Sequence, residues 1–307
     1  MSEDENLKKA RTKAKLSLLA VITIILLSLS LAVVIGLHPI SSAKYQERAQ
    51  DFKGALATYD KGLENSIYAV DPQIYVARAY CLRRLKRYDE GIASLEKADE
   101  LHAKYPTFFW MVGSDHSPVQ YRILIERGWN YYARKQYQEA LKCFDQALAI
   151  MQMDSAYQGR ASCYEEMGEL KKAEAEYKRA TEHTVACTRE RAHHEVGSFY
   201  RRQKRYDEAL EWLDKAQTYE ACAGVNREKA LIFWNKGDLD KASEQFHISL
   251  SRQRDPRVFA DRAQLRREKG DGQGALEDIQ SARQMDPDNP VYQEEERVIL
   301  SETGKLN

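Results

Sequence analysis

Histidine and cysteine side chains that could bind a metal gather in one stretch of the sequence. His183 and Cys187 lie four positions apart, a spacing that would place both on one face of a helix as two zinc ligands. His193 and His194 follow closely, but no convincing third and fourth ligand accompanies them. We therefore expect no metal or cofactor.

Motifs of the common catalytic sites are absent from the sequence. It contains no GxGxxG, GxxxxGK[ST], HExxH or GxSxG pattern. The glycines within residues 269–274 follow a predicted helix rather than a strand, so they do not form a phosphate-binding loop. We therefore expect that the protein is not an enzyme.

Composition narrows the class of protein further. The 307 residues include 47 basic and 47 acidic side chains, and this balance argues against a nucleic-acid partner. The five cysteines are too few for a disulfide framework. Cys143 and Cys163 are the pair best placed for a disulfide, but we expect most of the cysteines to be buried and free.

An uncharged run precedes the body of the chain. Residues 16–37 contain 22 residues without a charge, long enough to cross a bilayer as one helix. Five basic residues lie within 1–15, against three over a similar distance after the run, which favours a cytoplasmic N-terminus. We expect a basic tail over 1–15, a transmembrane anchor over 16–37 and a body on the far side, most readily the periplasmic face of a bacterial inner membrane.

Cleavage of a signal peptide is the rival interpretation of this N-terminal segment. Pro39 and the small residues of 41–43 resemble a helix breaker followed by a cleavage site. The apolar run is nevertheless longer than the usual core of a signal peptide, which favours an uncleaved anchor.

A unit of 33–36 residues repeats along the body, with one longer gap of 49. Each unit holds two small residues twelve positions apart, with an apolar residue four positions after the second. Apolar residues at this spacing mark one helical face, so each unit reads as a helix–turn–helix that must stack on its neighbours. The paired small residues are Ala43 and Ala55, Ala79 and Gly91, Gly128 and Ala140, Ala161 and Ala173, Gly197 and Ala209, Ala230 and Ala242, and Ala263 and Ala275.

This pattern resembles the tetratricopeptide repeat, a family with a period of about 34 residues. The resemblance covers about 41–290 and implies an all-α solenoid of about seven repeats, preceded here by the transmembrane helix. Residues 291–307 are expected to form a C-terminal capping helix. The family further implies a right-handed superhelix that binds proteins or peptides on its concave side.

An insertion at about 103–118 accounts for the one long gap. It carries a compact apolar group between Pro106 and Pro118, which either packs onto the solenoid or forms an accessory contact with a partner or the bilayer. The residues of this group are Phe108, Phe109, Trp110, Met111 and Val112.

The resemblance also implies that the first helix of each repeat lines the groove. The positions of this helix that line the groove in the family hold nine arginines and three glutamates in repeats two to seven of this chain, but no lysine or aspartate. Two interpretations stay open: the arginines bind an acidic, partly aromatic segment of a partner, or they pair with acidic neighbours on adjacent helices. The candidate groove residues are Arg83, Arg84, Arg122, Trp129, Tyr132, Arg191, His194, Arg201, Arg202, Arg227, Trp234, Arg257 and Arg267.

Together these features predict a membrane-anchored scaffold, assembly factor or chaperone accessory that holds a partner segment in a basic groove. One alternative is a receptor on an organelle surface with its solenoid in the cytosol. Another is a secreted repeat protein that has lost its signal peptide.

Overall fold

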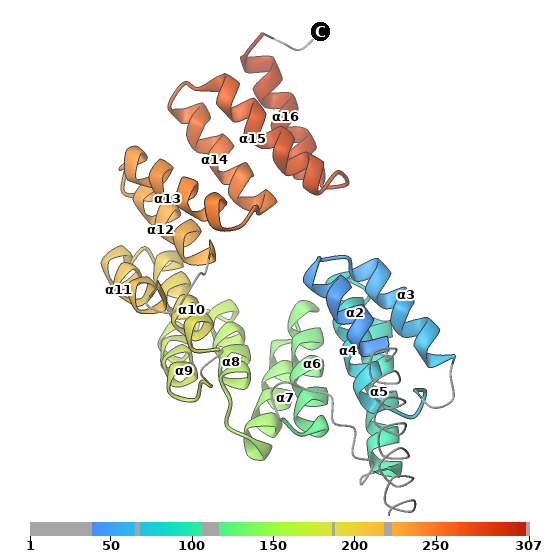
Figure 1. Cartoon of the computed structure of the whole chain (residues 1–307). Coiled ribbons are helices and arrows are strands. Elements are labelled where there is room, and N and C mark those ends of the chain that lie inside the picture. Colours follow the sequence, from blue (N-terminus) through green and yellow to red (C-terminus); the bar gives the residue numbers. More distant parts are fainter. Residues whose placement is uncertain (1–38, 65–67, 106–116, 186–187, 218–222, 305–307) are drawn as a thin grey trace, which may run out of the picture. The chain divides into compact units, whose positions relative to one another are not determined.

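A computed structural model describes residues 39–64, 68–105, 117–185, 188–217 and 223–304. These residues form fifteen α-helices, labelled α2 to α16, and contain no strand. The chain divides into two compact units, Met1–Met151 and Gln152–Asn307, each built from successive helix pairs (Figure 1). The all-α repeat architecture predicted from the sequence is confirmed.

Unit 1 contains three helix pairs. They are α2 (Pro39–Arg48) with α3 (Phe52–Leu63), α4 (Pro72–Arg84) with α5 (Tyr88–Lys104), and α6 (Val119–Ala133) with α7 (Tyr137–Ile150).

Unit 2 contains four pairs and a final helix. The pairs are α8 (Asp154–Glu166) with α9 (Leu170–Glu182), α10 (Arg189–Arg202) with α11 (Tyr206–Gln217), α12 (Ala223–Asn235) with α13 (Leu239–Arg252), and α14 (Pro256–Glu268) with α15 (Gly272–Met285), followed by α16 (Pro290–Glu302).

The turn inside each repeat has the same backbone conformation. The amide of Gly168 donates to the carbonyl of Glu165 at 2.9 Å, and that of Glu169 donates to Tyr164 at 2.8 Å. This pair of bonds is the usual cap of a helix C-terminus, and it requires a left-handed residue. A residue with positive φ recurs at the matching position of all seven repeats: Gln50, Lys86, Lys135, Gly168, Lys204, Gly237 and Gly270.

The small residues of the repeat lie where paired helices touch. All five alanines and both glycines at the first position, and every small residue at the second, are buried. A Cβ atom added to Gly128 would lie 2.6 Å from the Phe144 ring, and one added to Gly197 would lie 2.6 Å from Leu213. These large side chains therefore occupy the space that the missing Cβ atoms leave open.

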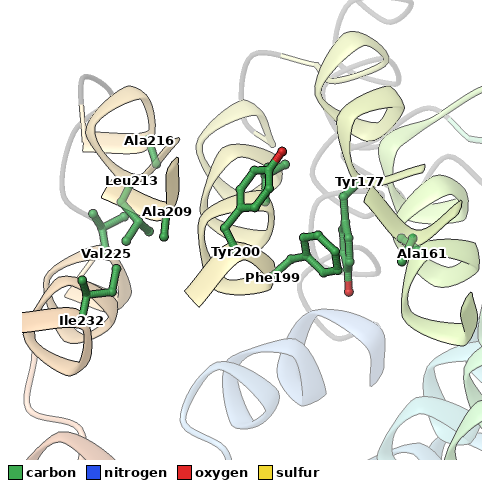
Figure 2. Close-up of a cluster of buried hydrophobic side chains, with 11 residues drawn as sticks. Ala161, Tyr177, Phe199, Tyr200, Ala209, Leu213, Ala216, Val225 and Ile232 are labelled. Atoms are coloured by element: carbon green, nitrogen blue, oxygen red, sulfur yellow. The ribbon is translucent and has the colours of Figure 1, made fainter. Parts of the chain in front are cut away.

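Aromatic side chains continue this packing between repeats. In unit 2 the ring of Tyr177 on α9 lies 5.2 Å from that of Phe199 on α10, and both are almost fully buried (Figure 2). Leu213 and Ile232 extend the same cluster toward α12. Within unit 2, the helices α8 to α12 thus share one buried cluster, as stacked repeats require.

The sequence also predicts a capping helix at the C-terminal end of the chain and a transmembrane anchor at the N-terminal end. Helix α16 buries Tyr292 and Ile299 and exposes Glu294 and Arg297, as a capping helix would. No helix in the described part of the chain is long and apolar enough to cross a membrane. The anchor predicted over 16–37 lies outside the described residues.

The left-handed turns predict opposite effects at two matched positions. Lys204→Gly should stabilise the protein by about 0.5–1 kcal/mol, because a side chain is strained at positive φ. Gly237→Ala should destabilise it by about 1 kcal/mol for the same reason. Urea unfolding followed through Trp212 and Trp234 measures both, and shifts of the same sign would contradict this account.

The helix contact in the third repeat predicts a sharp difference between neighbours. Ala140 is fully buried on α7, so Ala140→Leu should overpack the contact and cost about 1–3 kcal/mol. Lys142 is exposed on the same helix, and Lys142→Ala should cost less than about 0.5 kcal/mol. Equal melting shifts for the two variants would show that the register is wrong.

Candidate partner-binding face

The groove residues predicted from the sequence lie on the first helices of the repeats, which are α4, α6, α8, α10, α12 and α14. We call their surface the first-helix face. Within unit 1, α4 contacts α6, and within unit 2, α8 contacts α10 and α10 contacts α12. The predicted slots therefore belong to neighbouring helices within each unit.

Ion pairs join α8 to α10 at both ends of their contact. Arg191 on α10 donates to Asp154 on α8 at 3.0 Å. Arg202, near the other end of α10, donates twice to Glu165, at 2.7 and 2.8 Å. A forked arginine–carboxylate pair of this kind is among the stronger polar contacts in proteins.

The same arrangement continues from α10 through α12 to α14. Arg201 donates to Glu228 at 2.5 Å, and Arg227 donates to Asp261 at 2.6 Å. The indole N–H of Trp234 donates to Glu268 at 2.7 Å. Charge-assisted hydrogen bonds thus bridge every successive first helix of unit 2.

Two further arginines of unit 2 are also neutralised. Arg257 pairs with Asp255, the residue that caps the N-terminus of α14. Arg267 on α14 pairs with Glu295 and Glu302 on α16. All six groove arginines of unit 2 therefore have a carboxylate partner.

Unit 1 differs in this respect. Arg83 on α4 donates to Glu126 on α6 at 2.6 Å, and both side chains are largely buried. Arg122 donates instead to the neutral amide oxygen of Gln73, at 2.6 Å. The guanidinium of Arg84 lies 4.3 Å from the centre of the Phe52 ring and makes no ion pair among the described residues.

The aromatic groove residues are half-buried rather than free. Trp129 lies edge-on to Tyr132 and to Phe144, each with ring centres 5.4 Å apart. Trp234 lies 6.3 Å from Phe246 in the same manner. Each ring therefore anchors the first helix to the core and keeps only part of its surface for a partner.

Electrostatics within the face follow from burial. Burial raises the pKa of the Glu126 carboxyl, and Arg83 opposes that shift. Burial alone would lower the pKa of His194, but Glu195, Glu228 and the Gly224 backbone together outweigh it and leave that pKa raised. His194 therefore holds its proton more readily than a free imidazole.

The structure thus shows the ion pairs that the second interpretation of the arginines expects. Seven of the nine groove arginines are paired with carboxylates, and Arg84 and Arg122 are the exceptions in the described part of the chain. Binding of a partner on this face stays a prediction.

Family models match most of this helical body. One tetratricopeptide repeat model matches residues 121–152, and another matches 41–106, 164–225 and 227–290. Together they cover more than half of the chain. The chain belongs to the tetratricopeptide repeat family.

Solved structures show the same fold at low sequence identity. Yeast Tom70 matches with a TM-score of 0.63 and 15% identity over 85% of this chain, and the APC/C hetero-tetramer Cut9–Hcn1 with 0.58 and 14% over 87%. These matches span 53% and 49% of those chains. A tetratricopeptide repeat protein from Parabacteroides merdae matches with 0.56 and 14%, over 85% of this chain and 97% of its own. No curated protein matches.

A second set of ion pairs in these tetratricopeptide repeats was not predicted from the sequence. A basic residue directly before the first small residue pairs with an acid on a second helix of the same or the preceding repeat. The recurrence of a basic residue at this one position could have revealed these pairs from the sequence. The acidic partners, however, lie at different positions from one repeat to the next. The pairs are Arg78–Asp60, Arg127–Asp99, Arg160–Glu176, Lys229–Asp214 and Arg262–Asp278.

The histidines considered as metal ligands have other contacts. His183 stacks on Tyr157 with ring centres 4.8 Å apart, and His193 lies 5.6 Å from Trp212. Cys187 lies outside the described residues. Within the described ranges no three potential ligands gather as a metal site would require.

The cysteines and the apolar group of the insertion were also singled out in the sequence. Cys81, Cys143 and Cys163 are buried and free. Phe108, Phe109, Trp110 and Met111 of the insertion lie outside the described residues, so their accessory role stays a prediction.

The pair between Arg201 and Glu228 predicts a non-additive effect. The Glu228 side chain is only 8% exposed, so Arg201→Met should cost about 1–3 kcal/mol by leaving it poorly compensated. Adding Glu228→Leu should recover much of that loss, because neither buried charge remains. Thermal unfolding of both single variants and the double variant measures this, and additive losses would contradict it.

Proposed function

We propose that this tetratricopeptide repeat protein is a membrane-anchored scaffold whose first-helix face holds a segment of a partner protein. It acts by binding, and it positions the partner for assembly or translocation without chemistry of its own. The observation that carries the proposal is the repeat array itself. The family's repeats occupy most of the chain after the apolar run, and they present partly exposed arginines and aromatic rings on one set of helices.

The partner segment we propose is acidic and partly aromatic. Arginine recognises carboxylates through two parallel hydrogen bonds, and half-buried rings offer surfaces for stacking. A tetratricopeptide repeat fold typically binds proteins or peptides, which supports this class of partner. Most arginines of the face are already paired, so selectivity should come from the few that are not.

Crosslinking of the anchored protein in its own membrane tests the proposed function. We expect the full chain to capture one distinct protein partner reproducibly. Capture should weaken as salt is raised, since charged contacts are screened. Absence of any captured partner under conditions that preserve the fold would contradict the scaffold proposal.

The proposed location has its own test. We propose that residues 16–37 cross the membrane with the N-terminus in the cytoplasm, on the evidence of the charge bias and the length of the run. Alkaline phosphatase fused after Asn307 should then be active, because that enzyme needs an oxidising compartment. An inactive phosphatase fusion together with a fluorescent cytosolic reporter fusion would reverse the topology and favour an organelle-surface receptor.

A further inference from the structure

We propose that the acidic segment of the partner binds unit 1, with Arg84 on α4 and Arg122 on α6 as its two carboxylate-binding residues. This inference rests on the proposed function, because it locates the same binding event on particular helices. It excludes the first-helix face of unit 2 as the site for acidic groups.

The two units differ in how many of their groove arginines are already paired with a carboxylate of the protein itself. A guanidinium that already holds a carboxylate must break that contact before it can hold another, so the exchange gains little. All six groove arginines of unit 2 are held in this way. Among the described residues, Arg84 and Arg122 are the groove arginines without an ion pair.

Arg84 is exposed and pre-organised. Its guanidinium lies over the Phe52 ring, and its Nη1 donates to the Tyr80 hydroxyl at 3.3 Å. The Phe52 and Tyr80 rings lie edge to face with centres 5.9 Å apart, which fixes this support. A guanidinium resting on an aromatic face leaves N–H groups along its edge for a carboxylate.

In the part of the chain that the structure describes, no ion pair neutralises the positive charge of Arg122, because its hydrogen-bond partner is the neutral side-chain amide of Gln73. Asp71 and Glu126 interact electrostatically with Arg122, but neither forms an ion pair with it in the described part of the chain. Asp71 caps α4 by accepting a hydrogen bond from the backbone N–H of Gln73 at 2.8 Å. Burial raises the pKa of Asp71 to about 6, and the Gln73 N–H and Arg122 oppose that rise, so its carboxylate is ionised at neutral pH and offsets part of the Arg122 charge from a distance. Glu126 is held by Arg83.

Glu47 on α2 is likewise occupied. It accepts hydrogen bonds from the Tyr59 hydroxyl at 2.8 Å and from the Cys81 thiol at 3.6 Å. Neither donor carries a charge, so Glu47 offsets part of the local positive potential without binding either arginine.

The separation of the two arginines sets the spacing of the partner's acidic groups. Arg122 is tied to Gln73 at the start of α4, and Arg84 ends the same helix eleven positions later. At about 1.5 Å per residue the two anchor points lie roughly 16 Å apart. An extended chain advances about 3.3 Å per residue, so two carboxylates about five residues apart would reach both.

A peptide panel tests this inference on the full-length chain in detergent. The probe is a fluorescein-labelled peptide with two glutamates about five residues apart and a tyrosine between them. Its controls have glutamines in place of the glutamates, or the glutamates about two residues apart. We expect the first peptide to bind at least tenfold more tightly than either control, as measured by fluorescence anisotropy. Equal binding of the glutamate and glutamine peptides would overturn the inference.

Matched variants then locate the site. R84Q/R122Q should weaken binding of the glutamate peptide at least tenfold, whereas R191Q/R257Q, which removes two exposed but paired arginines of unit 2, should change it less than about twofold. Melting curves confirm that both variants fold. The reverse ranking would place the acidic site in unit 2 and overturn the inference.

Charge exchange provides the rescue. R84E/R122E should lose the glutamate peptide and gain a matching peptide with two lysines at the same spacing. Failure to gain the lysine peptide, in a variant that still melts cooperatively, would show that these two side chains do not contact the charges. Capture of a partner in the membrane crosslinking experiment would leave the scaffold proposal standing in either case, so the two failures are distinguishable.

Discussion

The close approach of two helices at small side chains is the contact on which the rest of the structure depends. Where Gly128 and Gly197 lack a Cβ atom, Phe144 and Leu213 fill the space, and a larger residue would force the helices apart. This contact fixes which face of the first helix looks toward the core. It thereby also fixes which side chains remain for a partner. A single packing constraint, repeated seven times, sets both the fold and the candidate binding face.

Ion pairs also hold the charged side chains of that face in defined positions. In unit 2 they connect the successive first helices α8, α10, α12 and α14, and Arg267 links α14 to Glu302 on the capping helix α16. Such partly exposed pairs contribute modestly to stability one by one, but they hold long side chains in defined positions. Their consequence for function is larger, since a neutralised arginine is a poor receptor for an acidic group. The two units therefore present different chemistry from the same family of repeats.

The fold could be predicted from the sequence because its signal is periodic. Small residues such as Ala140 and Ala209, with Phe144 and Leu213 four positions later, define helix pairs without knowledge of any contact. The prediction of a capping helix over 291–307 rested instead on apolar residues set among charged ones, and the structure places a helix at Pro290–Glu302. The backbone conformation of the turns was harder to predict. Lys86 and Gly168 occupy the same left-handed position, but only glycine commonly indicates such a conformation in a sequence.

The state of the groove arginines could not be predicted, because it depends on how adjacent helices align. Arg202 reaches back to Glu165, whereas Arg201 reaches forward to Glu228, and neighbouring positions in the sequence do not distinguish the two.

Site-specific photocrosslinking tests most directly whether the first-helix face is the binding surface. A photoreactive phenylalanine analogue would replace Ile125, which lies on α6 three positions after Arg122 and is partly exposed. The matched position on the second helix of the same repeat is Lys142 on α7. Both variants would be irradiated as full-length chains in the native membrane. This account predicts that position 125 forms an adduct with the partner and position 142 does not. An adduct confined to position 142 would contradict it.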